Sequence, residues 1–253
     1  MYAFITGASS GIGKAFSIWL AKSRYNLILI GRREERLIFL KKKLEEKYGI
    51  HVIIKAMDLT NRQDCFSLFE EIKSLPVTMV INNAGSGVTG FFTDTGLSDE
   101  LDMIDTNITA VHIFTKLFAE HMKHGSIINV SSMAAFHATP FFAAYGATKS
   151  YVYSLSTAVN YELKRQKKDV HITCLCPGLV DTEFYRNGEQ PLKEFMISPK
   201  ECARHGLAGT YKKKALVIPT TSMKLSFALS KVTPKAVMNP IQYFLQSGKQ
   251  KDH

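Results

Sequence analysis

A glycine-rich turn between two short apolar runs constrains this chain most. The run Tyr2–Ile5 leads into TGASSGIG at Thr6–Gly13, a helical pattern follows to about Arg24, and a second apolar run covers Leu27–Ile30. Small residues let a backbone turn tightly beside a pyrophosphate, and the helix that follows points its N-terminal N–H groups at the anion. A strand, a glycine turn, a helix and a strand within about 30 residues predict a dinucleotide site. Its expected members are Gly7, Ser9, Ser10, Gly11, Ile12 and Gly13.

The end of the second apolar run predicts which dinucleotide binds. An NAD site normally offers an acid there for the ribose 2′-hydroxyl, whereas this chain has Gly31, Arg32 and Arg33. A guanidinium binds phosphate through planar, charge-assisted hydrogen bonds, so the 2′-phosphate of NADP(H) is favoured. The alternative is that both arginines only end the strand and begin the next helix.

Strand and helix patterns alternate along the rest of the chain. Apolar runs at 51–57, 77–81, 126–130 and 170–176 predict further strands, and helical patterns at 34–48, 62–73, 102–122 and about 143–168 separate them. This alternation predicts an α/β fold, a doubly wound, Rossmann-like parallel sheet with helices on both faces. We expect one domain over residues 1–253, with a basic, helical C-terminal extension at 212–253.

Small and polar residues follow the predicted strands, at the edge where open parallel sheets bind ligands. The carboxylate of Asp58 is placed to accept a hydrogen bond from an adenine amino group, or else it only precedes the N-cap of the next helix. The loop 86–96 is expected to line the substrate mouth, and a segment with Phe184, Tyr185 and Met196 to cover it. The other cofactor-wall candidates are Leu59, Asn83, Ala84, Gly85, Pro177, Gly178, Val180 and Thr182.

Ser132, Tyr145 and Lys149 form the candidate catalytic group. Four positions separate Tyr145 from Lys149, so both share one face of a helix, and an ammonium beside a phenol lowers a pKa that is about 10 in water. Tyr145 thereby becomes a proton donor or acceptor near neutral pH. The alternative is an ordinary helix with a surface lysine and a half-buried tyrosine. Asn107, inside a helical pattern, either opens the helix to hold a water or is an exposed or capping residue.

Composition narrows the class of protein. The 253 residues are 45% hydrophobic, contain no apolar run near the roughly 18 residues of a membrane span, and carry a net charge of +10. We expect no signal peptide, because the glycine motif begins at Thr6. The four cysteines lack metal-ligand spacing, which indicates core thiols in a reducing cytoplasm. From Lys212 onward there are eight lysines and one aspartate; this tail is either a solvated face or a contact with a membrane surface or an anionic partner.

The ordered motifs resemble those of the short-chain dehydrogenases/reductases over roughly 2–182: TGASSGIG, NNAG at 82–85, Asn107, Ser132, YGATK at 145–149 and PG at 177–178. The resemblance implies that Ser132 orients a carbonyl, that Tyr145 is the acid/base, and that Lys149 binds the nicotinamide ribose and lowers the Tyr145 pKa. It also implies a water held by Asn107, and contacts of Val180 and Thr182 with the nicotinamide amide. Arg32 falls where NADP-preferring members carry a basic residue.

The predicted function is NADPH-dependent reduction of a ketone or aldehyde, reversible as alcohol oxidation. Abundant aromatic residues near the site indicate an apolar small-molecule substrate. We expect no metal and no nucleic-acid partner, a cytoplasmic location, and a homodimer or homotetramer. The C-terminal part departs from the usual tetrameric pattern and is more similar to the branch with hydroxysteroid and long-chain ketoacyl reductases. The alternatives are a catalytically silent NADP(H)-sensing module and a peripheral membrane protein of the same fold.

Overall fold

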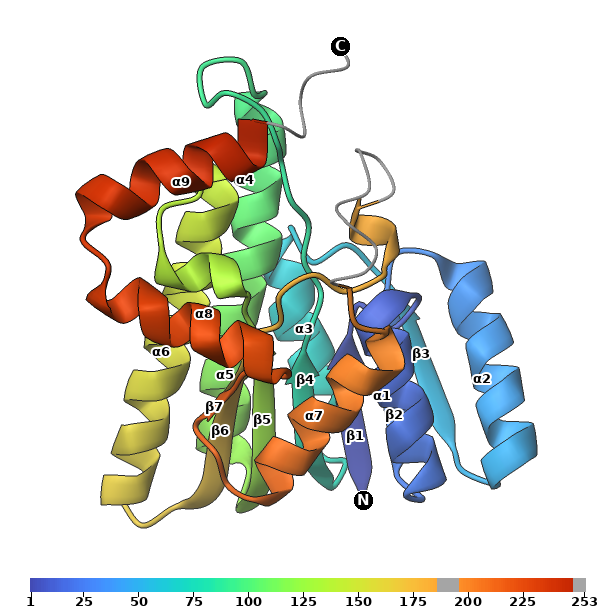
Figure 1. Ribbon diagram of the computed structural model, residues 1–253. Coiled ribbons are helices and arrows are strands. Elements are labelled where there is room, and N and C mark those ends of the chain that lie inside the picture. The colour runs from blue at the N-terminus through green and yellow to red at the C-terminus, as the bar shows by residue number, and fades with distance from the viewer. Residues whose placement is uncertain (186–195, 248–253) are drawn as a thin grey trace.

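The computed structural model describes residues 1–185 and 196–247 (Figure 1). In these residues all strands pair in parallel in one sheet, in the order β3-β2-β1-β4-β5-β6-β7. The doubly wound, Rossmann-like class predicted from the sequence is thereby confirmed. The strands are β1 (Tyr2–Thr6), β2 (Asn26–Gly31), β3 (Val52–Ala56), β4 (Val77–Asn82), β5 (His124–Val130), β6 (Asp169–Leu175) and β7 (Leu216–Val217).

Helices cover both faces of the sheet (Figure 1). Side chains alternate between the faces of a strand, so Ala3 and Ile5 of β1 enter one core and Phe4 enters the other. Because both faces are covered, the central strands are apolar at nearly every position. The first core is closed by α1 (Gly11–Lys22), α2 (Glu34–Tyr48) and α7 (Pro199–Tyr211), and the second by α3 (Arg62–Ile72), α5 (Ala110–His121) and α6 (Ala143–Arg165).

The helix expected at 102–122 is not continuous. The chain instead forms α4 (Leu97–Ile104), a π-helical turn (Asp105–Thr109) and then α5. The wider turn falls at Asn107, which is fully buried. Helical periodicity does not distinguish an α turn from a π turn, and π turns are frequent at functional sites. The sequence pattern had predicted no helix at the position of α7.

The reversal of strand order places a crevice at the middle of the sheet. β1 pairs with β2 on one side and with β4 on the other, so the chain crosses from β3 at one edge to β4 beside β1. In open parallel sheets, ligands bind beyond the carboxyl ends of the strands at such a switch point. The motifs singled out from the sequence follow β1, β2, β4, β5 and β6, all at this edge.

Two helices complete the described chain, α8 (Thr221–Val232) and α9 (Lys235–Ser247). α8 packs against a 3-10 turn (Met133–Phe136), where the rings of Phe136 and Phe227 lie 4.4 Å apart. Both helices lie within the helical extension expected at 212–253. No helix within the described ranges has the length and apolar character needed to cross a bilayer. All four cysteines are buried and free.

Candidate active site

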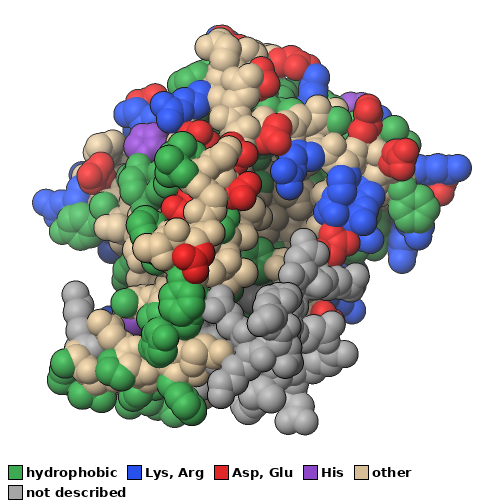
Figure 2. Space-filling model, turned by 90° about the horizontal axis from the view of Figure 1, so that it is seen from above, with side chains coloured by type: hydrophobic (Ala, Val, Ile, Leu, Met, Phe, Trp, Pro, Cys, Tyr) green, Lys and Arg blue, Asp and Glu red, His purple; other side chains and the backbone are tan. Residues whose placement is uncertain are grey.

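A cleft of about 840 Å³ opens at the carboxyl ends of the strands, and Figure 2, which looks down on this edge, shows the hollow. Residues that follow β1 and β2 line one end of it, and residues that follow β5 and begin α6 line the other. Every site residue predicted from the sequence lines this cleft except Gly13 and Asn107, which are buried. Most of the segment expected to cover the cleft, 186–195, lies outside the described residues.

The glycine-rich turn presents a bare helix N-terminus to the cleft. Ser10 is the N-cap of α1, yet its side chain makes no capping hydrogen bond. By contrast, Asn61, Ser198 and Thr220 each cap their helices with a side-chain oxygen. The first N–H groups of α1 are therefore left for another acceptor, and a pyrophosphate fits there.

Gly7 shows why this turn needs glycine. Its φ of +67° lies in the left-handed region, and a Cβ on it would stand 2.7 Å from the side-chain nitrogen of Asn83. Asn83 in turn donates to the carbonyl of Thr6 at 3.0 Å, while the Thr6 hydroxyl accepts the backbone N–H groups of Asn83 and Ala84. The loops after β1 and β4 thus lock together and form the floor of the cleft.

Of the two predicted arginines, Arg33 is the one that contacts the glycine-rich turn. Its Nη2 donates to the Ser10 hydroxyl at 2.7 Å and to the Ser9 hydroxyl at 3.2 Å. Arg32 is largely exposed, with its guanidinium 3.8 Å from the Asp58 carboxylate. The structure therefore brings the predicted arginines to the adenosine end, with Arg33 bound to the glycine turn.

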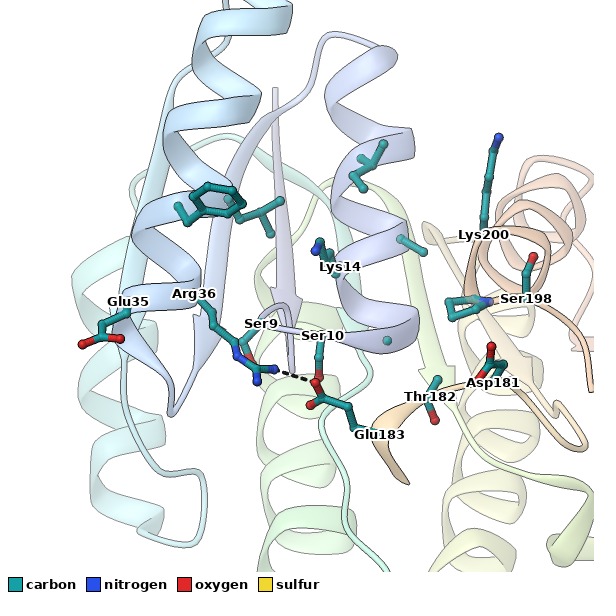
Figure 3. A pocket seen from close by; sticks show the side chains of 16 residues that line it. Ser9, Ser10, Lys14, Glu35, Arg36, Asp181, Thr182, Glu183, Ser198 and Lys200 are labelled. Atoms are coloured by element: carbon teal, nitrogen blue, oxygen red, sulfur yellow. Dashed lines mark hydrogen bonds and ion pairs between the residues drawn. The ribbon is translucent and has the colours of Figure 1, made fainter. Parts of the chain in front are cut away.

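A carboxylate that the sequence reasoning missed also reaches these arginines. Glu183, in the 3-10 turn Glu183–Tyr185, accepts from Arg33 at 2.6 Å and from Arg36 at 2.7 Å. Hydrogen bonds from Arg33 and Arg36 lower the pKa of Glu183 to about 2. Figure 3 shows Arg36 and Glu183 in direct contact, and both line a second hollow of about 590 Å³ beside α1 and α2. No local pattern signals this contact, because 150 and 147 positions separate Glu183 from the two arginines.

Tyr145 and Lys149 lie on the same side of α6, as expected. The Lys149 ammonium is 5.7 Å from the centre of the Tyr145 ring and donates to the carbonyl of Val130 at 3.1 Å. Burial lowers the pKa of Lys149 from its usual 10.5 to about 8. Ser132 follows β5 and lines the same cleft. The three side chains thus line the same cleft.

Asn107 holds together the part of the cleft wall next to Lys149. Its amide donates to the Ser86 carbonyl at 2.9 Å and to the Thr148 hydroxyl at 3.0 Å, and its oxygen accepts from the Ser86 N–H at 3.0 Å. A Cβ on Gly85 would stand 2.9 Å from that oxygen and 3.3 Å from the Lys149 nitrogen. The π turn therefore tucks a buried amide against α6 and the loop after β4, which is neither an exposed nor a capping position.

Aromatic rings lie near Tyr145, and of these Phe184 also lines the cleft. The rings of Phe142 and Phe184 lie 6.2 Å and 5.4 Å from that of Tyr145. Phe141, whose φ is +64°, packs between Phe91 and Tyr243 of α9, at 4.9 Å and 5.1 Å. Such a backbone conformation is uncommon for a bulky residue and marks a position held by its surroundings. Ser86 and Gly87 of the 86–96 loop also line the cleft.

The described residues contain no group of three His, Cys, Asp or Glu able to hold an ion. The residues that line the cleft offer hydroxyl groups and the cations of Lys149, Arg32 and Arg33. A bare helix N-terminus and arginines are features that suit a dinucleotide.

Comparison with known proteins gives matches along most of the chain. A family model described as short chain dehydrogenase matches residues 1–192. A very-long-chain 3-oxoacyl-CoA reductase from Kluyveromyces lactis is 37% identical over 183 residues, which are 68% of this chain and 53% of that protein. The 17-beta-hydroxysteroid dehydrogenase type 3 of Mus musculus is 35% identical over 188 residues, 72% of this chain and 60% of that protein. The matches thus span little more than half the length of these relatives.

A solved structure gives the same fold. The short-chain dehydrogenase from Sphingobium yanoikuyae in complex with NADPH has a TM-score of 0.80 to this chain, at 24% identity, over 100% of this chain and 96% of that one. The likeness supports the architecture across the whole length, the C-terminal helices included.

Proposed function

The chain belongs to the short-chain dehydrogenase family, and from this membership we propose that it reduces a ketone or aldehyde with NADPH and oxidises the alcohol in the reverse direction. One observation carries the proposal: a single cleft joins Arg33, Ser9 and Ser10 at one end to Tyr145 and Lys149 at the other. We propose that a dinucleotide binds along this cleft, with its phosphates at the glycine-rich turn and its reactive ring beside Tyr145 and Lys149.

Each catalytic side chain then has one task. When bound, NADPH supplies the hydride for the carbonyl carbon. Ser132 donates a hydrogen bond to the carbonyl oxygen, and Tyr145 gives that oxygen its phenolic proton as negative charge builds there. The Lys149 ammonium stabilises the phenolate that remains and holds the nicotinamide ribose. The water-holding role of Asn107 stays a prediction; its side chain positions Ser86 and Thr148.

The preference for NADP(H) over NAD(H) rests on Arg33 and Arg32. Gly31, Arg32 and Arg33 at the end of β2 include no acidic residue, whereas an NAD site would offer one there to the 2′-hydroxyl. Two guanidiniums at that point favour a 2′-phosphate. Asp58 lines the cleft beyond β3, and we propose that its carboxylate accepts a hydrogen bond from the adenine amino group.

The substrate we propose is apolar and carries its carbonyl on or near a bulky carbon skeleton. The rings around Tyr145 and Phe141 support it, since apolar side chains give most of the binding energy in such mouths. The names of the two relatives suggest long-chain 3-oxoacyl thioesters and steroid ketones as the first compounds to test.

The test is NADPH oxidation, followed by absorbance, with steroid ketones, long-chain 3-oxoacyl thioesters and small diketones. We expect turnover with at least one apolar carbonyl, and a kcat/KM for NADPH above that for NADH. NADPH binding without turnover on any member of a broad panel would instead favour the silent NADP(H)-sensing module. A clear preference for NADH would overturn the cofactor assignment alone.

We also propose that α8 and α9 contact a membrane surface. Residues 212–247 contain no acidic residue, and Leu225, Leu229, Val237 and Phe244 are exposed on the two helices. Hydrophobic side chains gather at the lower left of Figure 2. An apolar helix face among lysines suits anionic lipid. A cytoplasmic location and a homodimer or homotetramer stay predictions.

A further inference from the structure

Glu183 occupies the donors that a cofactor phosphate would need. One carboxylate oxygen takes the Nη1 of Arg33, at 2.6 Å, and the other takes the Nη1 of Arg36, at 2.7 Å. Arg33 uses its other terminal nitrogen, Nη2, for Ser9 and Ser10 of the glycine turn. The anion therefore sits between α2 and the phosphate-binding turn, and Figure 3 shows the Glu183 side chain reaching toward Arg36 there.

A carboxylate and a phosphate monoester bind a guanidinium in the same way. Each accepts two parallel, charge-assisted hydrogen bonds from its planar fork. Three of the five N–H donors of Arg33 are already used for Glu183, Ser9 and Ser10, and a second anion beside Glu183 would meet like-charge repulsion. Because its pKa is lowered to about 2, Glu183 stays ionised wherever the enzyme is folded near neutral pH. Both anions therefore compete for one set of donors.

From this geometry we infer that Glu183 competes with the 2′-phosphate of NADP(H) for Arg33 and Arg36. The phosphate must displace the Glu183 carboxylate from both arginines when it binds, so Glu183 sets the affinity for NADP(H). The inference rests on the proposed use of NADP(H). Glu183 thus affects cofactor specificity in the opposite direction to the arginines. The arginines attract the 2′-phosphate, and the Glu183 carboxylate limits the affinity that they provide.

The expected change in affinity follows from how far the ion pairs of Glu183 with Arg33 and Arg36 are exposed to solvent. The three side chains are between 36% and 49% exposed, so solvent screens them. Exposed ion pairs contribute little each, and loss of a competitor that holds two of them should tighten 2′-phosphate binding about 3- to 10-fold. A ligand without the 2′-phosphate should bind equally well with or without Glu183.

The experiment measures binding by titration calorimetry with adenosine 2′,5′-bisphosphate and with 5′-AMP, for the full chain and for Glu183→Gln. The matched control is Glu35→Gln, which removes the same charge from the same hollow; Glu35 is exposed, and Figure 3 shows it pointing away from Glu183. Glutamine keeps the shape of the side chain, and equal melting temperatures would show that the variants fold alike.

We expect Glu183→Gln to bind the bisphosphate about 3- to 10-fold more tightly, with 5′-AMP unchanged and Glu35→Gln like the wild type. Salt gives a second signature. The wild type exchanges one set of ion pairs for another, so its affinity for the bisphosphate should fall less steeply with salt than that of Glu183→Gln.

Two results would overturn the inference in different ways. If the wild type prefers the bisphosphate to 5′-AMP and Glu183→Gln binds it equally or less tightly, Glu183 positions the arginines instead of competing, and the proposed cofactor survives. If neither protein prefers the bisphosphate, the NADP(H) assignment fails and takes the inference with it.

Discussion

Lys149 is a buried cation whose charge changes close to neutral pH. Its side chain is 4% exposed, and burial lowers its pKa to about 8. A lowered lysine pKa means that the amine is protonated below pH 8 and neutral above it. Because Lys149 is the cation proposed to stabilise the Tyr145 phenolate, loss of its charge should change the rate of carbonyl reduction.

We predict that kcat/KM for carbonyl reduction falls above an apparent pKa of about 8. Reduction needs a proton on Tyr145 and a charge on Lys149, so loss of either proton should lower the rate about tenfold per pH unit. The apparent value belongs to the coupled pair. A pH profile of kcat/KM checks this, and a profile that stays level to pH 10 would remove Lys149 from the mechanism.

At the residue scale, the sequence predicted most of the cleft, because Gly7, Ser132, Tyr145 and Lys149 belong to motifs whose chemistry is local. The family match confirms the resemblance on which their roles rest, while the roles themselves stay predictions. Glu183 was missed, since its significance depends on a contact between distant segments. Arg33 rather than Arg32 binds the glycine turn, and the sequence alone could not rank two adjacent arginines.

At the scale of elements, a buried polar network ties the two central strands to the helices of one face. Asn82 of β4 donates to Asn129 of β5 at 2.8 Å, and Asn129 donates to Ser156 of α6 at 2.9 Å. Thr115 of α5 donates to Asn129 at 3.2 Å. These hydrogen bonds connect β4, β5, α5 and α6, and hydrogen-bonded side chains of this kind favour one arrangement of a core; α6 also carries Tyr145 and Lys149.

Aromatic packing holds the same face, and it gives a stability prediction. Phe114 of α5 is fully buried, with its ring 4.9 Å from that of Phe4 in β1. Phe114→Ala should lower the free energy of unfolding by about 3–5 kcal/mol, because it leaves a cavity between helix and sheet. Urea denaturation checks this against Phe66→Ala, which truncates a ring that is 44% exposed on α3 and should cost about 1 kcal/mol or less. Equal costs would mean that Phe114 is not part of the core.

Element types were largely predictable, and element details were not. Periodicity of 2 and 3.6 reflects burial on one or two faces, so β1 and α2 could be read from the sequence. The π turn at Asn107 could not, because it depends on what the buried amide contacts in α6. The helix α7 was missed although its Ser198 N-cap and Pro199 are standard signals of a helix start.

At the scale of the whole molecule, α8 has two different faces. Its inner face packs Phe227 against Phe136, and the sulfur of Met223 accepts the Gly178 N–H at 3.3 Å. Its outer face leaves Leu225 and Leu229 in solvent. The helices thus join the catalytic cleft to an apolar surface.

We predict that the protein sediments with vesicles of phosphatidylglycerol and phosphatidylcholine, and that Leu225→Asp with Phe244→Asp reduces the bound fraction several-fold. Each change places a charge where apolar surface would enter the lipid. Phe39→Asp, at a similarly exposed ring on α2, is the control and should bind like the wild type. Equal partitioning of all three proteins would refute the membrane surface.

The central claim is that Tyr145 gives its proton to the substrate, and Tyr145→Phe tests it most directly. Tyr151→Phe is the matched control, since Tyr151 lies on the same helix and its hydroxyl bonds to His112 at 2.6 Å. With the best substrate of the carbonyl panel, we predict that Tyr145→Phe lowers kcat by about 100-fold or more, while NADPH binding measured by fluorescence stays the same and Tyr151→Phe remains active. A Tyr145→Phe enzyme with near-normal kcat would contradict the account.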